Sequence, residues 1–424
     1  MNPINIIFSE LAKGKRIDAE ELLLLMKAEG RDQTLLNLAD ELNTRVNGPY
    51  VTFVHNRNIN YTNICVNNCL FCAYKRNAGD SDSYLLSVED TLRRISQTPD
   101  ITEVCIQGGI STELDFDFIL EMVGAIREAH PHIHIHAFSP MEIRHFARTT
   151  GTGVEEVFTK LIDQGLDSIP GTAAEILDDD VRRLICPEKL SSAEWVDIIS
   201  LAHRMGLKST ATILVGHTEK WDHIAHHFDL VREIQKKTGG FTEFIPLFFI
   251  PYSTRLGHVF QIRTCWSLAN AARLYALARI FFHGTIDNIQ SSWPKLGLDN
   301  AVSCLSWGVN DLGGTLYEEN ITRQAGGGWG QYVKLDEFKA RILACGKIPR
   351  QRDTLYNSVQ VSGFQPSLFR AMAWQAGVRT MSNHGCLKYS QISIPRVNRP
   401  LRRPQEALTP IFRSNCRPRS QWLS

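Results

Sequence analysis

The stretch Asn63-Ile64-Cys65-Val66-Asn67-Asn68-Cys69-Leu70-Phe71-Cys72-Ala73-Tyr74 supplies three thiols at a C-x3-C-x2-C spacing, with no fourth cysteine nearby. Structural zinc sites and ferredoxin-type clusters ordinarily use four protein ligands. Three thiolates on one loop therefore predict an iron–sulfur cluster that keeps one iron open for chemistry. The alternatives are a zinc site completed by a distant residue such as His55, or three unrelated buried thiols.

This spacing resembles the signature of the radical S-adenosylmethionine (SAM) enzymes. The resemblance implies a 4Fe–4S cluster on Cys65, Cys69 and Cys72, with the open iron chelated by the amino and carboxylate groups of SAM. It also implies that an electron from the cluster splits SAM into methionine and a 5'-deoxyadenosyl radical. Phe71, directly before Cys72, is expected to pack over the cluster or the adenine edge, unless it only fills the loop.

Composition indicates a large enzyme without a polyanionic partner. The 424 residues are 43% hydrophobic with a formal net charge of +1, so we expect a sizeable core and no affinity for nucleic acid or membrane. The N-terminus lacks the pattern of a secretion signal, and no run approaches membrane-spanning length. Ten cysteines in this chain length do not form a disulfide scaffold, and cluster thiolates need a reducing compartment. A cytoplasmic location is expected.

Short β-rich runs alternate with helix-like segments from residue 51 onward. Amphipathic helices are expected before them, at Ala19–Lys27 and 33–45, with Asp18 and Asp32 as N-caps. The eight runs are VTFVHNRNINYTNIC (51–65), EVCIQGG (103–109), HIHIHAFS (132–139), GLDSIPG (165–171), STATILVG (209–216), GFTEFIPLFFI (240–250), GTIDNIQ (284–290) and AVSCLSWG (301–308). Their spacing predicts an α/β protein, a parallel (β/α)8 barrel of the TIM type with N-terminal helices and an irregular C-terminal tail.

Three segments follow from this pattern. Residues 1–49 are expected to be helical, and residues 50–360 to form the barrel and its C-terminal part. Residues 361–424 are expected to be a basic, proline-containing tail with poor order, in which Glu406 is the only acidic residue after Arg370. The tail is interpreted as solvated chain or as an extension read in an altered frame, ahead of a site for RNA or an acidic partner. It is assigned no function.

The active site of such a barrel lies at the C-terminal ends of the strands. Gln107, Gly108 and Gly109 end the second run, where glycine lets backbone groups approach a ligand closely. This resembles the loop that receives the methionyl amino group of SAM, with an ordinary glycine turn as the alternative. Glu175 is predicted to accept the ribose hydroxyls of SAM and Arg182 to pair with its carboxylate, unless both are helix-surface charges.

Other polar residues near the strand ends are candidates for contacts with substrate. His134 and His136 share one face of their strand and are either substrate contacts or satisfied groups of the barrel core. His217 and Glu219 are candidates for proton transfer or hydrogen bonding, with capping of the loop as the alternative. Candidate catalytic residues also include the Asn310-Asp311 pair, in a glycine-rich run (309–315) that is not a P-loop.

The resemblance extends over residues 50–356, to the group of radical SAM enzymes that contains CofH, MqnE and MqnC. The strings that carry it are NRNINYTNICVNNCLFCAY, IQGGI, HAFSPMEI, GLDSIPGTAAEILDDDVRRLICPEK, SAEWVDII, ILVGHTE, GGFTEFIPL, NDLGGTLYEENITR and PRQRDTLY. Three stretches look most like the CofH branch: 138–142, 240–246 and 310–315.

The CofH-like resemblance implies a specific activity. The radical takes a hydrogen atom from L-tyrosine, and a 4-hydroxybenzyl unit passes to 5-amino-6-(D-ribitylamino)uracil in deazaflavin (FO) biosynthesis. It implies a CofG-like radical SAM partner subunit and an electron donor such as a ferredoxin or flavodoxin. The alternatives are a menaquinone-pathway enzyme of the MqnE or MqnC type, which uses another substrate, and a non-catalytic iron–sulfur or zinc protein, which needs a fourth ligand.

Overall fold

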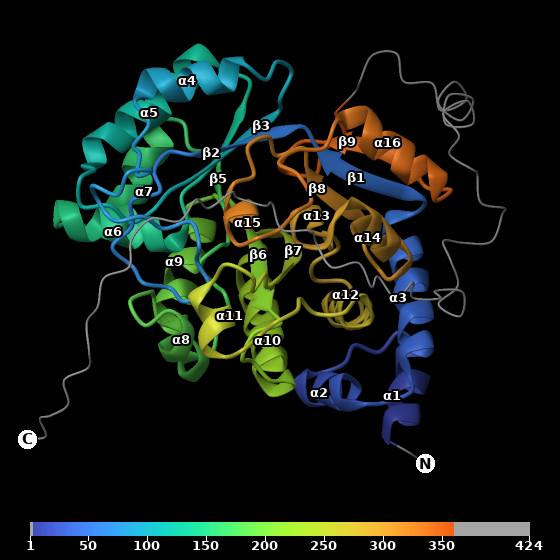
Figure 1. Cartoon of the computed structure of the whole chain (residues 1–424). Helices are drawn as coiled ribbons and strands as arrows, with labels where there is room; N and C mark the ends of the chain where they lie inside the picture. Colours follow the sequence, from blue (N-terminus) through green and yellow to red (C-terminus); the bar gives the residue numbers. More distant parts are fainter. Residues whose placement is uncertain (1–2, 360–424) are drawn as a thin grey trace, which may run out of the picture. The chain divides into compact units, whose positions relative to one another are not determined.

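The centre of the structure is a curled sheet of six parallel strands in the order β2-β3-β4-β5-β6-β7 (Figure 1). The computed structural model describes residues 3–359, so the predicted tail at 361–424 lies outside the described residues. The strands are β2 (Asn56–Asn60), β3 (Glu103–Gln107), β4 (His134–Ala137), β5 (Ser168–Ile169), β6 (Lys208–Val215) and β7 (Phe241–Phe248). Helices connect successive strands, as parallel neighbours require.

A second parallel sheet, in the order β8-β1-β9, completes the barrel. Its strands are β1 (Tyr50–Val54), β8 (Asp311–Gly314) and β9 (Ile348–Arg352). Bridges from Phe244 to Ile289 and from Gln290 to Asp311 link β7 to β8. On the other side, Asn58 N donates a hydrogen bond of 2.6 Å to Leu316 O, just beyond β8. These links confirm the predicted fold class, a parallel α/β barrel of the TIM type.

Three of the eight predicted strands differ from the structure. The run at 51–65 forms two strands, β1 and β2, which separate at His55 and join different sheets. The run at 284–290 forms only single bridges, and the run at 301–308 is helical, in α14 (Leu298–Ser303) and the short helix η1 (Cys304–Ser306). The last error arises because a short buried apolar run has no periodicity that separates strand from helix.

The sequence prediction also lacks β8 and β9 as strands. β8 contains Gly313 and Gly314, and glycine is unusual within strands. A Cβ atom on Gly314 would lie 2.0 Å from Asn56 Oδ1, so the close approach of β8 to β2 requires glycine at this position. β9 contains Pro349, which a strand at the edge of a sheet tolerates because one side of its backbone needs no donor.

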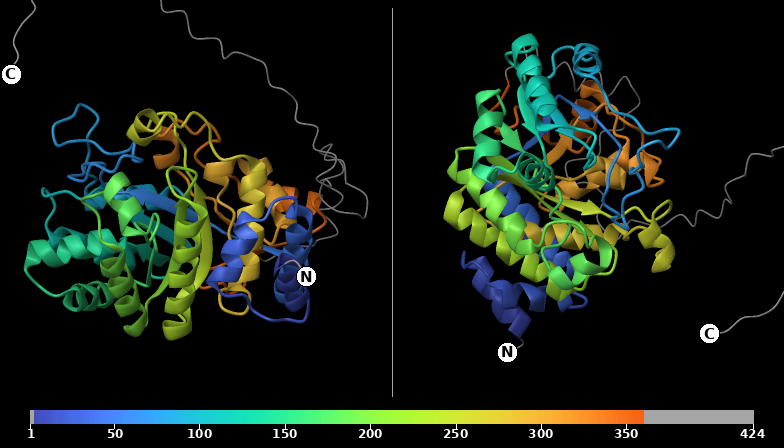
Figure 2. Two further views of the ribbon diagram at one scale, coloured as in Figure 1. Left: turned by 90° about the horizontal axis from the view of Figure 1, so that it is seen from below. Right: turned by 90° about the vertical axis from the view of Figure 1, so that its left-hand side faces the viewer.

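Helices cover the outside of the barrel (Figures 1 and 2). Beyond α14, those that follow β2 are α4 (Val88–Ser96), α5 (Phe116–Ala129), α6 (Pro140–Thr150), α7 (Val154–Asp163), α8 (Asp179–Ile185), α9 (Ser192–Arg204), α10 (Trp221–Thr238), α11 (Arg255–Val259), α12 (Leu268–Phe282), α13 (Trp293–Leu296), α15 (Ile321–Gln324) and α16 (Leu335–Ala344). None of the helices in residues 3–359 has both the length and the apolar character needed to cross a bilayer.

Three N-terminal helices pack on the barrel rather than standing apart. They are α1 (Pro3–Ala12), α2 (Ala19–Lys27) and α3 (Asp32–Asn47); α2 contacts α10 and α12, and α3 contacts α12 (Figure 2). Asp18 caps α2 as predicted, in a capping box with Glu21. The predicted cap at Asp32 is wrong, because Asp32 is the first helical residue and its carboxylate pairs with Arg273 of α12.

Arg279 fastens α12 to the chain that leads into β8. Its guanidinium is fully buried and donates to Gly308 O at 2.7 Å, Asp287 O at 2.6 Å and Asn310 Oδ1 at 2.8 Å. No carboxylate pairs with it in the described part of the chain, and burial lowers its pKa to about 10. The charge is therefore held by neutral oxygens alone, which fixes the approach of β8 to the barrel.

We expect Arg279→Ala to lower the free energy of unfolding by about 3 kcal/mol, because it leaves buried carbonyl oxygens without their donor and opens a cavity. The exposed Arg204→Ala should change it by less than about 0.5 kcal/mol. Urea unfolding followed by circular dichroism measures both values. Equal stability of the two variants would contradict this account of α12.

Candidate active site

A cavity of about 430 Å³ opens inside the barrel. Its wall includes all three thiols of the cysteine loop (residues 64–74), the glycines after β3, and side chains from the strands of both sheets. The cavity thus joins the C-terminal ends of the strands to the barrel interior, as the fold predicts for an active site.

Backbone hydrogen bonds fix the cysteine loop to three other parts of the barrel. Val66 N donates to Ile110 O at 2.8 Å, behind β3, and Leu70 N donates to Ile185 O at 2.8 Å, at the end of α8. Leu256 N of α11 donates to Leu70 O at 2.7 Å. A loop that carries three thiols is therefore held rigidly before any ligand binds.

The thiols fit a polynuclear cluster better than a single metal ion. Cys69 is buried, while Cys65 and Cys72 are partly exposed on the cavity wall. No group of three His, Cys, Asp or Glu side chains in residues 3–359 would hold a single metal ion, which argues against a closed zinc site. The ligands of a 4Fe–4S cluster bind separate irons and so lie apart. Burial raises the pKa values of Cys65 and Cys69, so loading of the cluster must displace their protons.

The glycines after β3 pack directly against the cysteine loop. A Cβ atom on Gly109 would lie 2.1 Å from Ile64 O, and one on Gly108 would lie 2.4 Å from the Tyr61 ring. Gln107, Gly108 and Gly109 all line the cavity, as predicted for a ligand loop. The close approach shows that glycine is needed here for packing as well.

Glu142 joins these same elements from α6. Its carboxylate accepts hydrogen bonds from Tyr61 Oη at 2.8 Å, Gly108 N at 2.9 Å and Ser139 N at 2.7 Å. Burial raises the pKa of Glu142 despite these donors. Glu142 also lines the cavity, so its main role is to hold the glycine loop on the wall of the site.

Glu175 and Lys189 form an ion pair of 2.6 Å beside the cysteine loop. Both line the cavity, and Lys189 Nζ lies 5.2 Å from the centre of the Phe71 ring. Burial opposes the charge on Lys189, but Glu175 and nearby thiols raise its pKa above the usual value. Phe71 therefore lies beside a cation and lines the cavity.

Arg182 does not reach the cavity. Its guanidinium donates to backbone oxygens of Leu190, Ala174, Ile176 and Ala173, and the side chain is buried. These bonds hold the 173–176 loop, whose residues Ala173 and Glu175 have positive φ angles of 63° and 44°. Arg182 therefore supports the loop that presents Glu175.

The four predicted catalytic residues also lie outside the cavity lining. Glu219 accepts from Gly216 N at 2.5 Å and His217 N at 2.9 Å, and His217 Nε2 lies 3.1 Å from Leu214 O. This is the capping arrangement that the sequence left open. Asn310 bonds to Arg279 and to Ile289 N, while Asp311 pairs with Arg352 at 2.6 Å.

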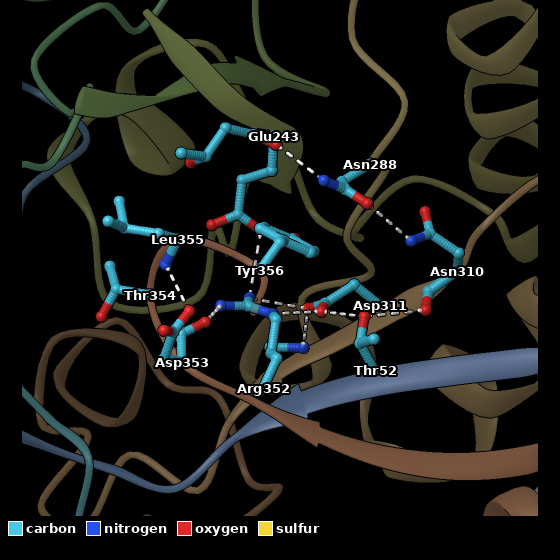
Figure 3. A network of polar contacts seen from close by, with 12 residues as sticks. Thr52, Glu243, Asn288, Asn310, Asp311, Arg352, Asp353, Thr354, Leu355 and Tyr356 are labelled. Atoms are coloured by element: carbon cyan, nitrogen blue, oxygen red, sulfur yellow. Dashed lines mark hydrogen bonds and ion pairs between the residues drawn. The ribbon is translucent and has the colours of Figure 1, made fainter. Parts of the chain in front are cut away.

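Arg352 is a cavity residue that the sequence reasoning missed. Figure 3 shows this arginine in its network of polar contacts. Its guanidinium lies between Asp311 and Glu243, with a distance of 3.3 Å to Glu243 Oε2, and Tyr356 Oη donates to the same oxygen. Burial raises the pKa of Glu243 to about 7. In the sequence, the only sign of Arg352 is its place in the string PRQRDTLY, which resembles the family. Arginine is usually exposed to solvent, so the residue type by itself does not indicate a buried site.

The histidines of β4 are satisfied within the barrel. His134 Nε2 and His136 Nδ1 each lie 2.7 Å from Ser168 Oγ. Burial lowers the pKa of His136 to about 4, so its ring is neutral at pH 7. His136 lines the cavity whereas His134 does not, so only His136 is placed to contact a ligand.

The sequence also matches models of two known families. The model described as "Radical SAM superfamily" matches residues 59–231, and the model described as "CofH/MqnC C-terminal region" matches residues 238–365. The HydG maturase of FeFe-hydrogenase from Carboxydothermus hydrogenoformans superposes with a TM-score of 0.64, covering 83% of this chain and 80% of that one. Methylornithine synthase (PylB) superposes with a TM-score of 0.60, covering 86% and 99%. At 17% and 15% identity, these two structures support the fold alone.

Two curated relatives are much more similar in sequence. A protein of Methanococcus maripaludis (strain C7) is 44% identical over 353 residues, which are 82% of this chain and 98% of the relative. A protein of Archaeoglobus fulgidus is 46% identical over 322 residues, 76% of this chain and 92% of the relative. Both are named 5-amino-6-(D-ribitylamino)uracil–L-tyrosine 4-hydroxyphenyl transferase. The chain, with its three cavity thiols, therefore belongs to the radical SAM superfamily and, within it, to the CofH-type family of transferases.

Proposed function

We propose that this enzyme transfers the 4-hydroxybenzyl unit of L-tyrosine to 5-amino-6-(D-ribitylamino)uracil in the formation of the deazaflavin FO. The observation that supports this most strongly is the 44% identity to a relative of that name over 98% of the relative's length. The barrel interior adds physical support, because it offers both apolar wall and polar groups to the two substrates.

The proposal assigns Cys65, Cys69 and Cys72 as the cluster ligands, since all three face one cavity from a rigid loop. The cluster and SAM together supply a 5'-deoxyadenosyl radical that takes a hydrogen atom from tyrosine. Phe71, Gln107, Gly108, Gly109 and Glu175 are assigned to the SAM side of the cavity.

The remaining site residues are assigned to positioning. Arg182 shapes the loop of Glu175, Glu219 caps the turn at His217, and Asp311 orients Arg352. Asn310 holds the chain before β8 through Arg279. The side chains left to contact the tyrosine and the aminouracil are the polar groups of the barrel wall, among them His136, Glu243 and Arg352.

The proposal includes partners that complete the pathway. A CofG-like radical SAM subunit would convert the adduct to FO, and a ferredoxin or flavodoxin would reduce the cluster. We place the enzyme in the cytoplasm, because cluster thiolates persist in a reducing compartment. A menaquinone-type reaction is the second candidate, since the C-terminal family model covers MqnC as well as CofH.

The test is an anaerobic assay of the cluster-reconstituted protein with dithionite, SAM, tyrosine and 5-amino-6-(D-ribitylamino)uracil, followed by mass spectrometry. We expect 5'-deoxyadenosine together with an adduct that needs both substrates. SAM cleavage without a tyrosine-dependent adduct would move the assignment to the menaquinone branch. Omission of each substrate in turn is the control.

Cys69→Ala should abolish cluster binding and SAM cleavage while the barrel stays folded, because the buried thiol has no substitute on the loop. Cys186→Ala is the matched control, since Cys186 is also buried, and lies close enough to raise the pKa of Cys69, but is not part of the cavity wall. Iron and sulfide analysis after reconstitution measures cluster binding, and circular dichroism measures folding. Formation of 5'-deoxyadenosine by Cys69→Ala at the wild-type rate would refute the ligand assignment.

The raised pKa of Glu243 predicts a pH effect on stability. The unfolded carboxyl titrates near 4.5 and the folded one near 7, so the folded state holds more protons between these values. This contribution to stability is therefore lost as the pH rises from about 4.5 to about 7. Glu243→Gln should flatten the decline in melting temperature over this window, while the exposed Glu121→Gln should leave it unchanged. Parallel profiles for Glu243→Gln and wild type would count against a raised pKa.

A further inference from the structure

One cation on the cavity wall has no ion-pair or hydrogen-bond partner among the described residues. Within residues 3–359, the cationic side chains that line the cavity are Lys75, Lys189, Lys295 and Arg352. Lys75 donates to Asn68 Oδ1, Lys189 pairs with Glu175, and Arg352 pairs with Asp311 and Glu243. The ammonium of Lys295 has neither a hydrogen bond nor an ion pair in this part of the chain.

Lys295 is held in a fixed position. It lies in the short helix α13, where Trp293 Nε1 donates to Gly314 O of β8 at 2.8 Å. The helix closes with Gly297 N donating to Trp293 O at 2.8 Å, and Ser291 N donates to Asp311 O at 2.9 Å just before it. Trp293 is buried. The lysine therefore extends from a rigid base anchored on β8.

No carboxylate in residues 3–359 forms an ion pair with Lys295. Glu319 and Glu175 favour its charge from a distance, but Glu319 accepts from Thr322 N and Glu175 pairs with Lys189. Burial outweighs these attractions and lowers the pKa of Lys295. Keeping a charged ammonium without an ion-pair partner in this cavity costs free energy. An anionic group of a bound ligand would offset this cost by pairing with the ammonium.

We propose that Lys295 binds the carboxylate of the tyrosine substrate, an inference that rests on the proposed function. Of the two substrates, only tyrosine carries a carboxylate. SAM also has one, but the residues assigned to SAM come from the cysteine loop and from the loops after β3 and β5, whereas Lys295 follows the 289–290 bridge between β7 and β8. Cys72, Glu175 and Lys295 line the same cavity, so tyrosine bound at Lys295 would share that cavity with SAM.

Lys295→Met, Lys295→Arg and Lys160→Met test the proposal in the cluster-reconstituted enzyme with SAM. Lys160 is a surface lysine of α7 paired with Glu156, so it is the matched control. We expect Lys295→Met to weaken tyrosine binding by about 100-fold, the loss typical when one partner of a buried charge pair is removed. Lys295→Arg should recover most of the binding, and Lys160→Met should equal wild type. Equilibrium dialysis with labelled tyrosine measures affinity independently of turnover, and KM for tyrosine is measured beside it.

Tyramine, which lacks the carboxylate, identifies the group that is bound. Wild type should prefer tyrosine to tyramine, and Lys295→Met should lose this preference while its KM for SAM stays within about twofold. A loss of SAM binding instead would overturn the assignment to tyrosine and give the lysine to the methionyl carboxylate. Unchanged tyrosine binding in Lys295→Met and in Lys295→Gln would overturn it altogether. Failure of the wild type to form the adduct would refute the proposed function, while the dialysis result would still decide whether Lys295 binds tyrosine.

Discussion

The site depends on the attachment of one loop to the rest of the barrel. Three thiols hold a cluster only if the backbone between them keeps one conformation, and a loop of this length does not keep one alone. Here the loop is bonded to the chain after β3, to the end of α8 and to α11. Gly108 and Gly109 allow the contact with β3 because any side chain there would overlap Tyr61 or Ile64.

The polar groups of the cavity divide by their surroundings. The Glu175–Lys189 pair and Lys295 line the same cavity as the three cysteines, in which we propose that SAM and the tyrosine carboxylate bind. Arg352 bonds to both Asp311 and Glu243 (Figure 3). Elsewhere in the cavity, the neutral ring of His136 bonds to Ser168. A radical reaction needs a site that orients substrate and excludes water, and paired, rigid groups of this kind serve both needs.

The site residues predicted from local spacing lie together in the structure. Cys65, Cys69 and Cys72, the glycines after β3, Phe71 and Glu175 all line the cavity. Arg182, predicted to bind SAM, lies outside the cavity lining, as do the predicted catalytic residues His217, Glu219, Asn310 and Asp311. The hydrogen bonds of these side chains go to other parts of the barrel. Sequence shows that a polar residue is near a strand end but not which side of the loop it faces. The same limit hid Arg352 and Lys295.

The sequence by itself determined the fold class, the three thiols and the family, because each is encoded in short patterns: alternating runs, fixed cysteine spacing and family strings. Tertiary structure alone decided how the barrel closes, since β8 and β9 meet β1 only across more than 250 residues of chain. It also decided which charges are paired. Lys189 and Lys295 look alike in sequence, but within residues 3–359 only Lys189 forms an ion pair, because pairing depends on where distant elements place their side chains.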